Sequence, residues 1–562
     1  MREKYTRTVV LLVAVLTFFP LSISARSPVA SPATANHGLQ KILAYISNGW
    51  DTLTRSMSEC KAFSDPKTGE ESDLYLPANF PVPSALKDVE AKCKLQVKPL
   101  PTVIKQLGAI DVESIKPQGL LYLPKPYVVP GGMFNEMYGW DSYFIIRGLI
   151  DDGRVALARD IVDNLFFEID HYGGILNANR TYYLTRSQPP FLTSMIRAVY
   201  EAEKANGQAD PAWLAQGYHY AVKDYHFWTS PPHLAGTTGL SRYYGLGNGP
   251  VPELGASATD YYKLVVRYFL LHPADSQPYM MEVRQQPAGS KAVGPEFSLV
   301  LGEKGGSAKP ENLEKLALTR AFYKGDRSMR ESGFDVSFRF GPFGASTPDF
   351  AAVDLNSLLY KAEKDLEWMS SELGRKPDSE QWQRRALKRR AEIDRYLWNP
   401  QLGLYYDYDF KDGRGSLYTY ATTFYPLWAG LATPAQAEAV VRNLRAFEQP
   451  GGIVMSMNDT GAQWDYPYGW APIQLLAIEG LRRYGYQADA DRISLEFLSM
   501  VLDNFLRDGT IREKYNVVTR SSATQINVGY KANMVGFGWT NGVFLALLHE
   551  LPKPARALLN QQ

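Results

Sequence analysis

Apolar residues recur at spacings of three and four along most of this chain, which is the pattern of helices that bury one face. Alternating polar and apolar positions, typical of strands, are scarce. The pattern predicts a large domain of stacked helices with its chemistry on loops at one end, although two separate helical domains would give the same pattern. The predicted helices cover residues 39–55, 194–204, 355–373, 380–397, 434–447, 473–484 and 488–504.

Composition excludes several classes of protein. The formal net charge of +1 gives no electrostatic reason to expect nucleic acid or an anionic membrane surface as a partner. The seven histidines include no His-Glu-x-x-His pair, and two cysteines cannot build a Cys-rich zinc site. The chain also lacks a Gly-x-Ser-x-Gly turn and a Walker-type phosphate loop. Zinc proteases, serine hydrolases of that type and P-loop enzymes are therefore set aside.

The N-terminus has the residue order of a secretory signal peptide. Three cationic residues precede the apolar run 9–19, and small residues follow up to Ala25, where we expect cleavage. The run is short for a membrane anchor, which needs about 20 residues. We therefore expect an exported protein, periplasmic or secreted, that is not inserted in a membrane and begins with a disordered leader over 26–36. In an oxidising compartment Cys60 and Cys93 could form a disulfide, but two buried free thiols would look identical in sequence.

Two carboxylates that are far apart in sequence, Asp335 and Glu513, stand among residues suited to holding a sugar. One acid alone would indicate little, since the chain has 59 acidic residues. A pair brought together by the fold can cleave a glycosidic bond, because one acid protonates the leaving oxygen while the other activates water or attacks directly. The pair is therefore the candidate catalytic equipment.

Three loops are dense in aromatic, carboxylate and amide side chains: 130–143, 177–190 and 463–472. In the first, Trp140 offers a flat stacking face next to Asp141, which can accept hydrogen bonds from sugar hydroxyls. Each loop alone could equally pack a helix end or be held by an Arg–Asp pair. Several such loops in one chain, beside two candidate acids, favour a sugar-binding site.

These motifs resemble the trehalases, inverting glycoside hydrolases that split α,α-trehalose into two glucoses. The segment 130–143 is similar to the signature Pro-Gly-Gly-Arg-Phe-x-Glu-x-Tyr-x-Trp-Asp-x-Tyr, and 463–472 to Gln-Trp-Asp-x-Pro-x-Gly-Trp-x-Pro. The Arg-Ser-Gln-Pro-Pro, Glu-Ser-Gly-x-Asp, Glu-Lys-Tyr-Asn and Gly-Phe-Gly-Trp-Thr-Asn-Gly runs also match, in the family's order. The resemblance covers roughly residues 100–550.

The resemblance implies an all-α (α/α)6 toroid over residues 100–552, preceded by the signal peptide 1–25 and an extension over 26–99, and followed by a tail over 553–562. It makes Asp335 the general acid, which must be protonated to act, and Glu513 the general base, with carboxyl groups about 6.5–9.5 Å apart. It implies a disaccharide substrate, no metal or organic cofactor, and a protein we expect to be monomeric. The implied substrate-binding residues are Phe134, Trp140, Asp141, Asn177, Arg186, Gln188, Glu253, Gly333, Gln463, Trp464 and Trp539.

Three positions depart from the family pattern, which indicates an exported bacterial type with altered substrate binding. Met133 and Val251 stand where the family carries arginines, and Tyr530 stands where it carries an acid. Arg242 or Lys531 could supply a replacement cation. Two alternatives to a trehalase therefore remain: an inverting enzyme for another α-glucoside, and a sugar-binding relative without activity.

Overall fold

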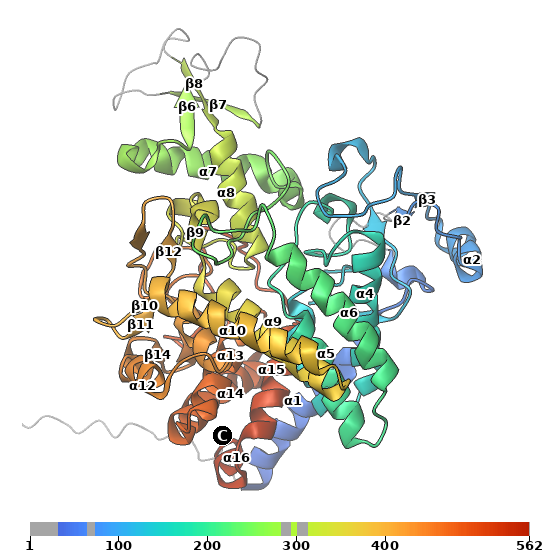
Figure 1. The fold of residues 1–562 in the computed structure, drawn as a ribbon, viewed down its shortest axis with the longest axis vertical. Helices are drawn as coiled ribbons and strands as arrows, with labels where there is room; N and C mark the ends of the chain where they lie inside the picture. The colour runs from blue at the N-terminus through green and yellow to red at the C-terminus, as the bar shows by residue number, and fades with distance from the viewer. Residues whose placement is uncertain (1–31, 64–72, 283–293, 301–312, 561–562) are drawn as a thin grey trace, which may run out of the picture.

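Six of the described helices form a closed ring. Three of them, α9, α13 and α15, are labelled near the centre of Figure 1. The computed structural model describes residues 32–63, 73–282, 294–300 and 313–560, so the expected signal peptide lies outside the described residues. Each ring helix packs on the next and α15 returns to α3, which closes the circle. The ring consists of α3 (Asp141–Asp151), α5 (Leu192–Ala205), α9 (Val353–Glu372), α11 (Tyr425–Trp428), α13 (Ala471–Arg483) and α15 (Gly538–Glu550).

Two glycines allow the closing contact of the ring. A Cβ atom on Gly148 of α3 would lie 2.3 Å from the Cα of Gly542 on α15. No side chain fits at that distance, so glycine is needed for the two backbones to approach this closely. Helices α3 and α15 therefore pack backbone against backbone.

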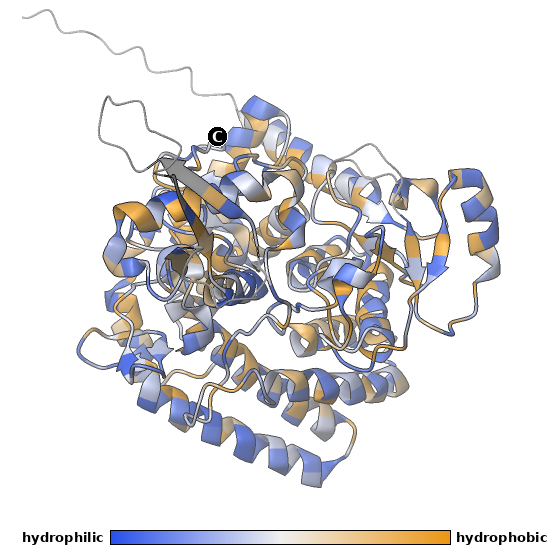
Figure 2. Ribbon diagram, turned by 90° about the horizontal axis from the view of Figure 1, so that it is seen from above, coloured by the Kyte–Doolittle hydropathy of each residue, from blue (hydrophilic) through white to orange (hydrophobic). Residues whose placement is uncertain are grey.

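A second layer of helices surrounds the ring and alternates with it along the chain. α10 illustrates why these helices stay outside: only Trp382, Ala386, Arg389 and Ile393 are buried, at spacings of three and four, and the other faces are more exposed and polar (Figure 2). This alternation is the (α/α)6 toroid that the resemblance implied, and the fold is confirmed. The outer helices are α1 (Pro32–Leu53), α4 (Val155–His171), α6 (Pro211–Trp228), α10 (Lys376–Tyr396), α12 (Pro434–Arg442) and α14 (Gln487–Asp508).

All seven predicted helices are present, with ends displaced by a few residues. The expected leader over 26–36 is helical from Pro32, and α1 packs on α14 and α15. The largest of three apolar clusters contains residues from Ile42 to Leu559, so segments from both halves of the chain share one core. Within the described ranges, no helix is long and apolar enough to cross a membrane.

The strands are short and lie in the connections between helices. β2 (Leu74–Leu76) pairs in parallel with β3 (Val97–Pro99) and β4 (Leu120–Leu121). β8 (Leu313–Leu318) pairs antiparallel with β6 (Met280–Glu282) and β7 (Glu296–Val300), beyond α7 (Ala258–Leu271) at the top of Figure 1. The antiparallel pair of β16 (Tyr468–Trp470) and β17 (Lys514–Asn516) matters most here, because it holds the loop 463–472 beside Glu513.

A partly buried ion network ties four ring helices together toward their C-terminal ends. Arg147 of α3 donates to Glu479 of α13 and lies 3.5 Å from Glu550 of α15. Trp428 of α11 donates to the other Glu479 oxygen at 2.8 Å, and Arg482 of α13 lies 3.3 Å from Glu550. The network therefore links the ring on the side opposite the helix N-termini.

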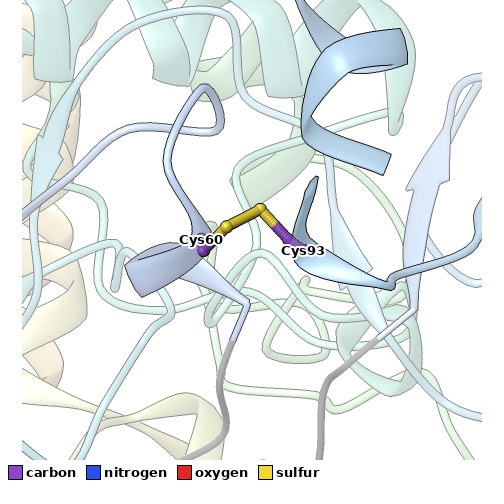
Figure 3. Close-up of a disulfide and its surroundings, with 2 residues drawn as sticks. All are labelled: Cys60 and Cys93. Atoms are coloured by element: carbon purple, nitrogen blue, oxygen red, sulfur yellow. A yellow bond between two sulfur atoms is a disulfide. The ribbon is translucent and has the colours of Figure 1, made fainter. Parts of the chain in front are cut away.

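Cys60 and Cys93 form a disulfide (Figure 3). Their Cα atoms lie 5.2 Å apart, with Cys60 beginning the 3-10 turn η1 (Cys60–Ala62) and Cys93 ending α2 (Ser84–Cys93). Of the two alternatives left by the sequence, the structure has the disulfide.

We expect the double variant Cys60→Ser/Cys93→Ser to unfold more easily than the wild type. The bond closes a loop across a separation of 33 residues, and loss of that constraint costs about 3–4 kcal/mol by chain entropy. Urea unfolding with and without reductant measures the effect. Reductant should destabilise the wild type and leave the double variant unchanged; equal stability of both proteins without reductant would contradict the expectation.

Candidate active site

The candidate residues lie at the N-terminal ends of the ring helices. Asp141 is the first residue of α3, and Trp539 lies in the first turn of α15. Gln463 and Trp464 precede α13, and Arg186 precedes α5. Because inner and outer helices alternate, these loops gather at one end of the ring. The predicted loops therefore come together as a single site.

Asp335 follows α8 (Arg320–Glu331) after a turn that only glycine fits. Gly333 has a φ of +79°, and a Cβ atom there would lie 2.9 Å from the Trp140 ring. The turn directs the chain so that Asp335 Oδ2 accepts a hydrogen bond from Arg330 Nη1 at 3.2 Å. Its side chain stays 20% exposed, so the carboxyl is accessible.

Charged groups surround Asp335. Arg330 is held on its far side by Asp326, whose Oδ1 accepts from Nε at 3.1 Å. Arg186 pairs with Glu253 at 2.6 Å, and the same Glu253 oxygen lies 3.8 Å from Arg330. The result is a chain of alternating charges next to the carboxyl.

Burial raises the pKa of Asp335 to about 6. The guanidinium groups of Arg330 and Arg186 lower that pKa in part, while the charge of Glu253 raises it. A substantial fraction of Asp335 therefore carries a proton in mildly acidic solution, which is what a proton donor needs.

Glu513 lies immediately before β17 and faces the same region. Its Oε2 is 3.2 Å from Nζ of Lys514, whose side chain is fully buried, while Glu513 itself is 13% exposed. The backbone carbonyl of Glu513 accepts from Trp539 Nε1 at 3.2 Å, and its N–H donates to the carbonyl of Met534 at 3.0 Å. The hydrogen bonds to Trp539 and Met534 fix the backbone of Glu513 on both sides of its peptide unit, which limits where its carboxylate can lie.

Gln463 links the backbone of Asp335 to the Lys514–Glu513 ion pair. Its Nε2 donates to the backbone carbonyl of Asp335. Its Oε1 accepts from Lys514 Nζ at 3.0 Å, and that ammonium contacts Glu513. Three contacts, through the side chains of Gln463 and Lys514, therefore join the backbone of Asp335 to the carboxylate of Glu513.

Asp141 lies within electrostatic range of both acids. Burial raises its pKa well above the ordinary value, and the charges of Glu513 and Asp335 raise it further. In the described ranges, no group of three or more His, Cys, Asp or Glu side chains is arranged to hold a metal ion.

Four tryptophans pack together beneath these groups. Trp464 stacks on Trp470 at 3.8 Å with an angle of 6° between the rings. Trp140 and Trp539 meet this pair and each other at centroid distances between 5.7 and 6.2 Å. All four are nearly buried, so they form a tightly packed aromatic cluster next to Gly333 and Gln463.

The other predicted residues shape the walls of the site. Gln188 accepts from the backbone N–H of Trp140 at 3.0 Å, which joins loop 177–190 to loop 130–143. Asn177 is buried, and its side chain donates to the carbonyl of Ser187 at 3.4 Å. Phe134 is half-buried, with its ring against Tyr138 at 5.5 Å. Asn177 and Gln188 thus bond to backbone groups of the walls, which gives both side chains a positioning role.

The three departures from the family pattern have different surroundings. Met133 is 39% exposed, whereas Val251 is buried and its N–H donates to the Tyr262 hydroxyl at 2.9 Å. The Tyr530 hydroxyl accepts from Arg330 Nη1 at 3.0 Å. Among the described contacts, neither of the proposed replacement cations, Arg242 and Lys531, contacts Arg330 or Asp335.

Arg242 donates to the carbonyls of Pro232 and Pro348, and Lys531 is exposed. Sequence reasoning missed the cations that do lie beside the acids, Arg330 and Lys514. Lys514 is next to Glu513 in the sequence, so its proximity to that acid could have been predicted. Arg330 precedes Asp335 by five residues, so the sequence indicates their contact less clearly.

A family model of trehalases matches residues 61–276 and 305–552, which is most of the chain. The chain belongs to the trehalase family. The unmatched interval contains β6 and β7, so part of the antiparallel sheet lies outside the family pattern.

Relatives of the trehalase family match over most of this chain. A probable trehalase of Eremothecium gossypii is 38% identical over 77% of this chain and 59% of its own length. A cytosolic neutral trehalase of Neurospora crassa is 34% identical over 88% of this chain and 71% of its own length. The solved structure of neutral trehalase Nth1 from Saccharomyces cerevisiae superposes with a TM-score of 0.73 at 31% identity, covering 93% of this chain and 96% of that one.

These relatives contradict the expected export. Several are named cytosolic neutral trehalases, so the prediction of a signal peptide and of a secreted or periplasmic protein is wrong. The relatives named here are fungal, and none supports an exported bacterial type. The prediction of export rested only on the composition of residues 1–25, where a short apolar run follows three cations. Such a composition does not by itself determine the cellular compartment of a protein.

Proposed function

We propose that this member of the trehalase family hydrolyses α,α-trehalose to two glucoses, with Asp335 as the general acid and Glu513 as the general base. The observation that carries the proposal is the link through Gln463, which joins the backbone of Asp335 to the Lys514–Glu513 pair. Two carboxyl groups held in one site with different charge surroundings are the equipment for glycoside hydrolysis.

The two acids divide the reaction between them. Asp335 gives its proton to the glycosidic oxygen as the bond to the anomeric carbon breaks. Glu513 takes a proton from a water molecule that attacks that carbon from the opposite face. A carboxyl separation of about 6.5–9.5 Å leaves room for the water. The attacked residue then leaves as β-glucose and the other as α-glucose.

The surroundings suit a neutral disaccharide. Trp140 packs next to the acids, and Asp141, Arg186 and Glu253 offer donors and acceptors for sugar hydroxyls. Arg186 and Glu253 are paired at 2.6 Å, so their charges balance and an uncharged ligand is favoured. The positions of these side chains support a small-molecule substrate bound in one monomer.

Hydrolysis of trehalose should release both anomers of glucose at the same time, β-glucose from the attacked residue and α-glucose from the leaving residue. Anomer-resolved NMR at early times, before mutarotation, should show equal amounts of α- and β-glucose. A product that is α only at early times would contradict inversion. The measurement needs only the wild-type protein and trehalose.

A second candidate is hydrolysis of another α-glucoside, favoured by Met133 and Val251 in place of arginines. Glucose release from trehalose, kojibiose, nigerose and maltose compares the two candidates. Trehalose cleaved with the highest kcat/KM supports the proposal, and preference for another disaccharide supports the second candidate. Binding without glucose release would indicate a sugar-binding relative and reject both.

We expect kcat/KM to fall as the pH rises through about 6. Asp335 acts only with its proton, and burial raises its pKa to about 6. Its protonated fraction therefore drops about tenfold for each pH unit above that value. The pH profile of trehalose hydrolysis measures the effect, and activity that stays flat from pH 5 to pH 8 would contradict the assignment.

A further inference from the structure

Tyr530 touches both halves of the site. Its backbone N–H donates to Gln463 Oε1 at 3.1 Å, and its carbonyl accepts from Lys514 Nζ at 3.1 Å. Lys514 also contacts Glu513 at 3.2 Å. The backbone of Tyr530 is therefore fixed on the side of the site that carries Glu513.

The side chain of Tyr530 reaches the opposite side. Its hydroxyl accepts from Arg330 Nη1 at 3.0 Å, and the same nitrogen donates to Asp335 Oδ2 at 3.2 Å. Since Nη1 carries two hydrogens, each acceptor can take one of them. Asp326 holds the other end of the guanidinium through Nε at 3.1 Å. Arg330 is thus held at both ends, with Tyr530 and Asp335 sharing the end that faces the site.

We propose that Tyr530 is a positioning residue that holds Arg330 against the general acid and ties the acid side of the site to the base side. The inference rests on the proposed roles of Asp335 and Glu513. The hydroxyl is neutral, so it orients Arg330 without competing as an anion for the guanidinium charge. A carboxylate in its place, as in the family pattern, would take part of that charge from Asp335.

The remaining charges around Asp335 do not replace this contact. Arg186 is paired with Glu253, and Lys514 with Glu513. The charges of Asp335 and Glu513 both act on the carboxyl of Asp141. The titratable and charged groups that act on Asp335 or on its partner Arg330 are Arg330, Arg186, Glu253, Asp141, Tyr530 and, through Arg330, Asp326.

The test compares two substrates that need the acid to different extents. Trehalose needs a proton on its leaving sugar, whereas the fluoride of α-glucosyl fluoride leaves without full protonation. In Tyr530→Phe, Arg330 loses one of its two acceptors at the site. We expect kcat on trehalose to fall about tenfold, with KM within about twofold, and turnover of the fluoride to stay within about twofold. Equal losses on both substrates would overturn the proposal.

A charged variant tests the same contact through the pH profile. In Tyr530→Glu, the new carboxylate adds negative charge beside Asp335 and competes for Arg330. We expect the alkaline limb of the kcat/KM profile to move up by about one pH unit. An active variant with an unmoved limb would overturn the proposal; if the variant is inactive, the substrate comparison in Tyr530→Phe decides.

Two controls separate this inference from other causes. Tyr408→Phe removes a phenol hydroxyl from half-buried β12 (Tyr408–Asp409), outside the site, and should change neither substrate ratio nor pH profile. Urea unfolding should give Tyr530→Phe the stability of the wild type. A wild type that cleaves no trehalose would reject the proposed function, and the fluoride and pH comparisons on whichever α-glucoside is cleaved would still test Tyr530.

Discussion

Asp335→Asn should lower kcat on trehalose about 10²–10⁴-fold, which is the range for loss of a positioned acid. The amide has the size of the carboxyl and can still contact Arg330, but it cannot give a proton to the glycosidic oxygen. Glu513→Gln should cause a loss of similar size, because an amide cannot take a proton from the attacking water. Steady-state kinetics with trehalose measures both.

The roles of Asp335 and Glu513 can be distinguished by comparing trehalose with α-glucosyl fluoride as substrates. α-Glucosyl fluoride should restore much of the turnover of Asp335→Asn, since fluoride leaves with little help from an acid. It should leave Glu513→Gln impaired, because water must still be activated. Asp412→Asn and Glu438→Gln, at exposed positions, are matched controls that should retain wild-type rates. Near-normal hydrolysis of trehalose by either site variant would reject the role given to that residue.

Arg147→Met should lower the free energy of unfolding by about 1–3 kcal/mol, between the values for an exposed and a fully buried ion pair. Met fills similar space but leaves the partly buried Glu479 without its cation, since Arg147 is the cation that contacts it directly. Arg442→Met breaks an exposed pair with Glu438, whose side chains are 64% and 62% exposed, and should cost less than about 1 kcal/mol. Urea unfolding compares the two variants, and equal effects would contradict the role of the network.

The same network gives stability a pH dependence. Burial and the charge of Glu479 raise the pKa of Glu550 from 4.5 to about 8. A carboxyl that binds its proton more tightly when folded contributes most below pH 4.5, and that contribution is lost as the pH rises to about 8. Glu550→Gln mimics the protonated form. The difference in stability between wild type and variant should therefore change between pH 5 and pH 8, and a constant difference would argue against this titration.

The sequence predicted the helices well where apolar spacing was strong. It placed the start of α10 at 380, whereas the helix begins at Lys376, because Pro377 in the first turn needs no N–H partner there. It extended α12 to 447, whereas the helix ends at Arg442 and a 3-10 turn, Leu444–Ala446, follows. Leu444 and Phe447 are buried three residues apart, a spacing that suits the 3-10 turn as well as the α-helix.

The residues around Asp335 were only partly predictable, because the sequence of α8 does not show that its charged side chains are buried beside the acid. Asp326, Arg327, Arg330 and Glu331 are all buried in this helix alongside its apolar residues, whereas a sequence pattern assigns charged positions to the solvent-facing side. Its polar groups bond to one another and to the loop before Glu253, where Arg327 donates to the carbonyls of Gly249 and Pro250. Motifs identified the two acids, but the cation beside Asp335 became visible only when distant segments were seen together.

The contact between α3 and α15 also bears on how the chain reaches its native state. These helices lie near opposite ends of the described chain, and Gly148 meets Gly542 directly. During synthesis from the N-terminus, the face of α3 that packs on α15 stays uncovered until the ribosome has made α15. We therefore expect chaperones that bind exposed apolar surface to hold the nascent chain until α15 has emerged.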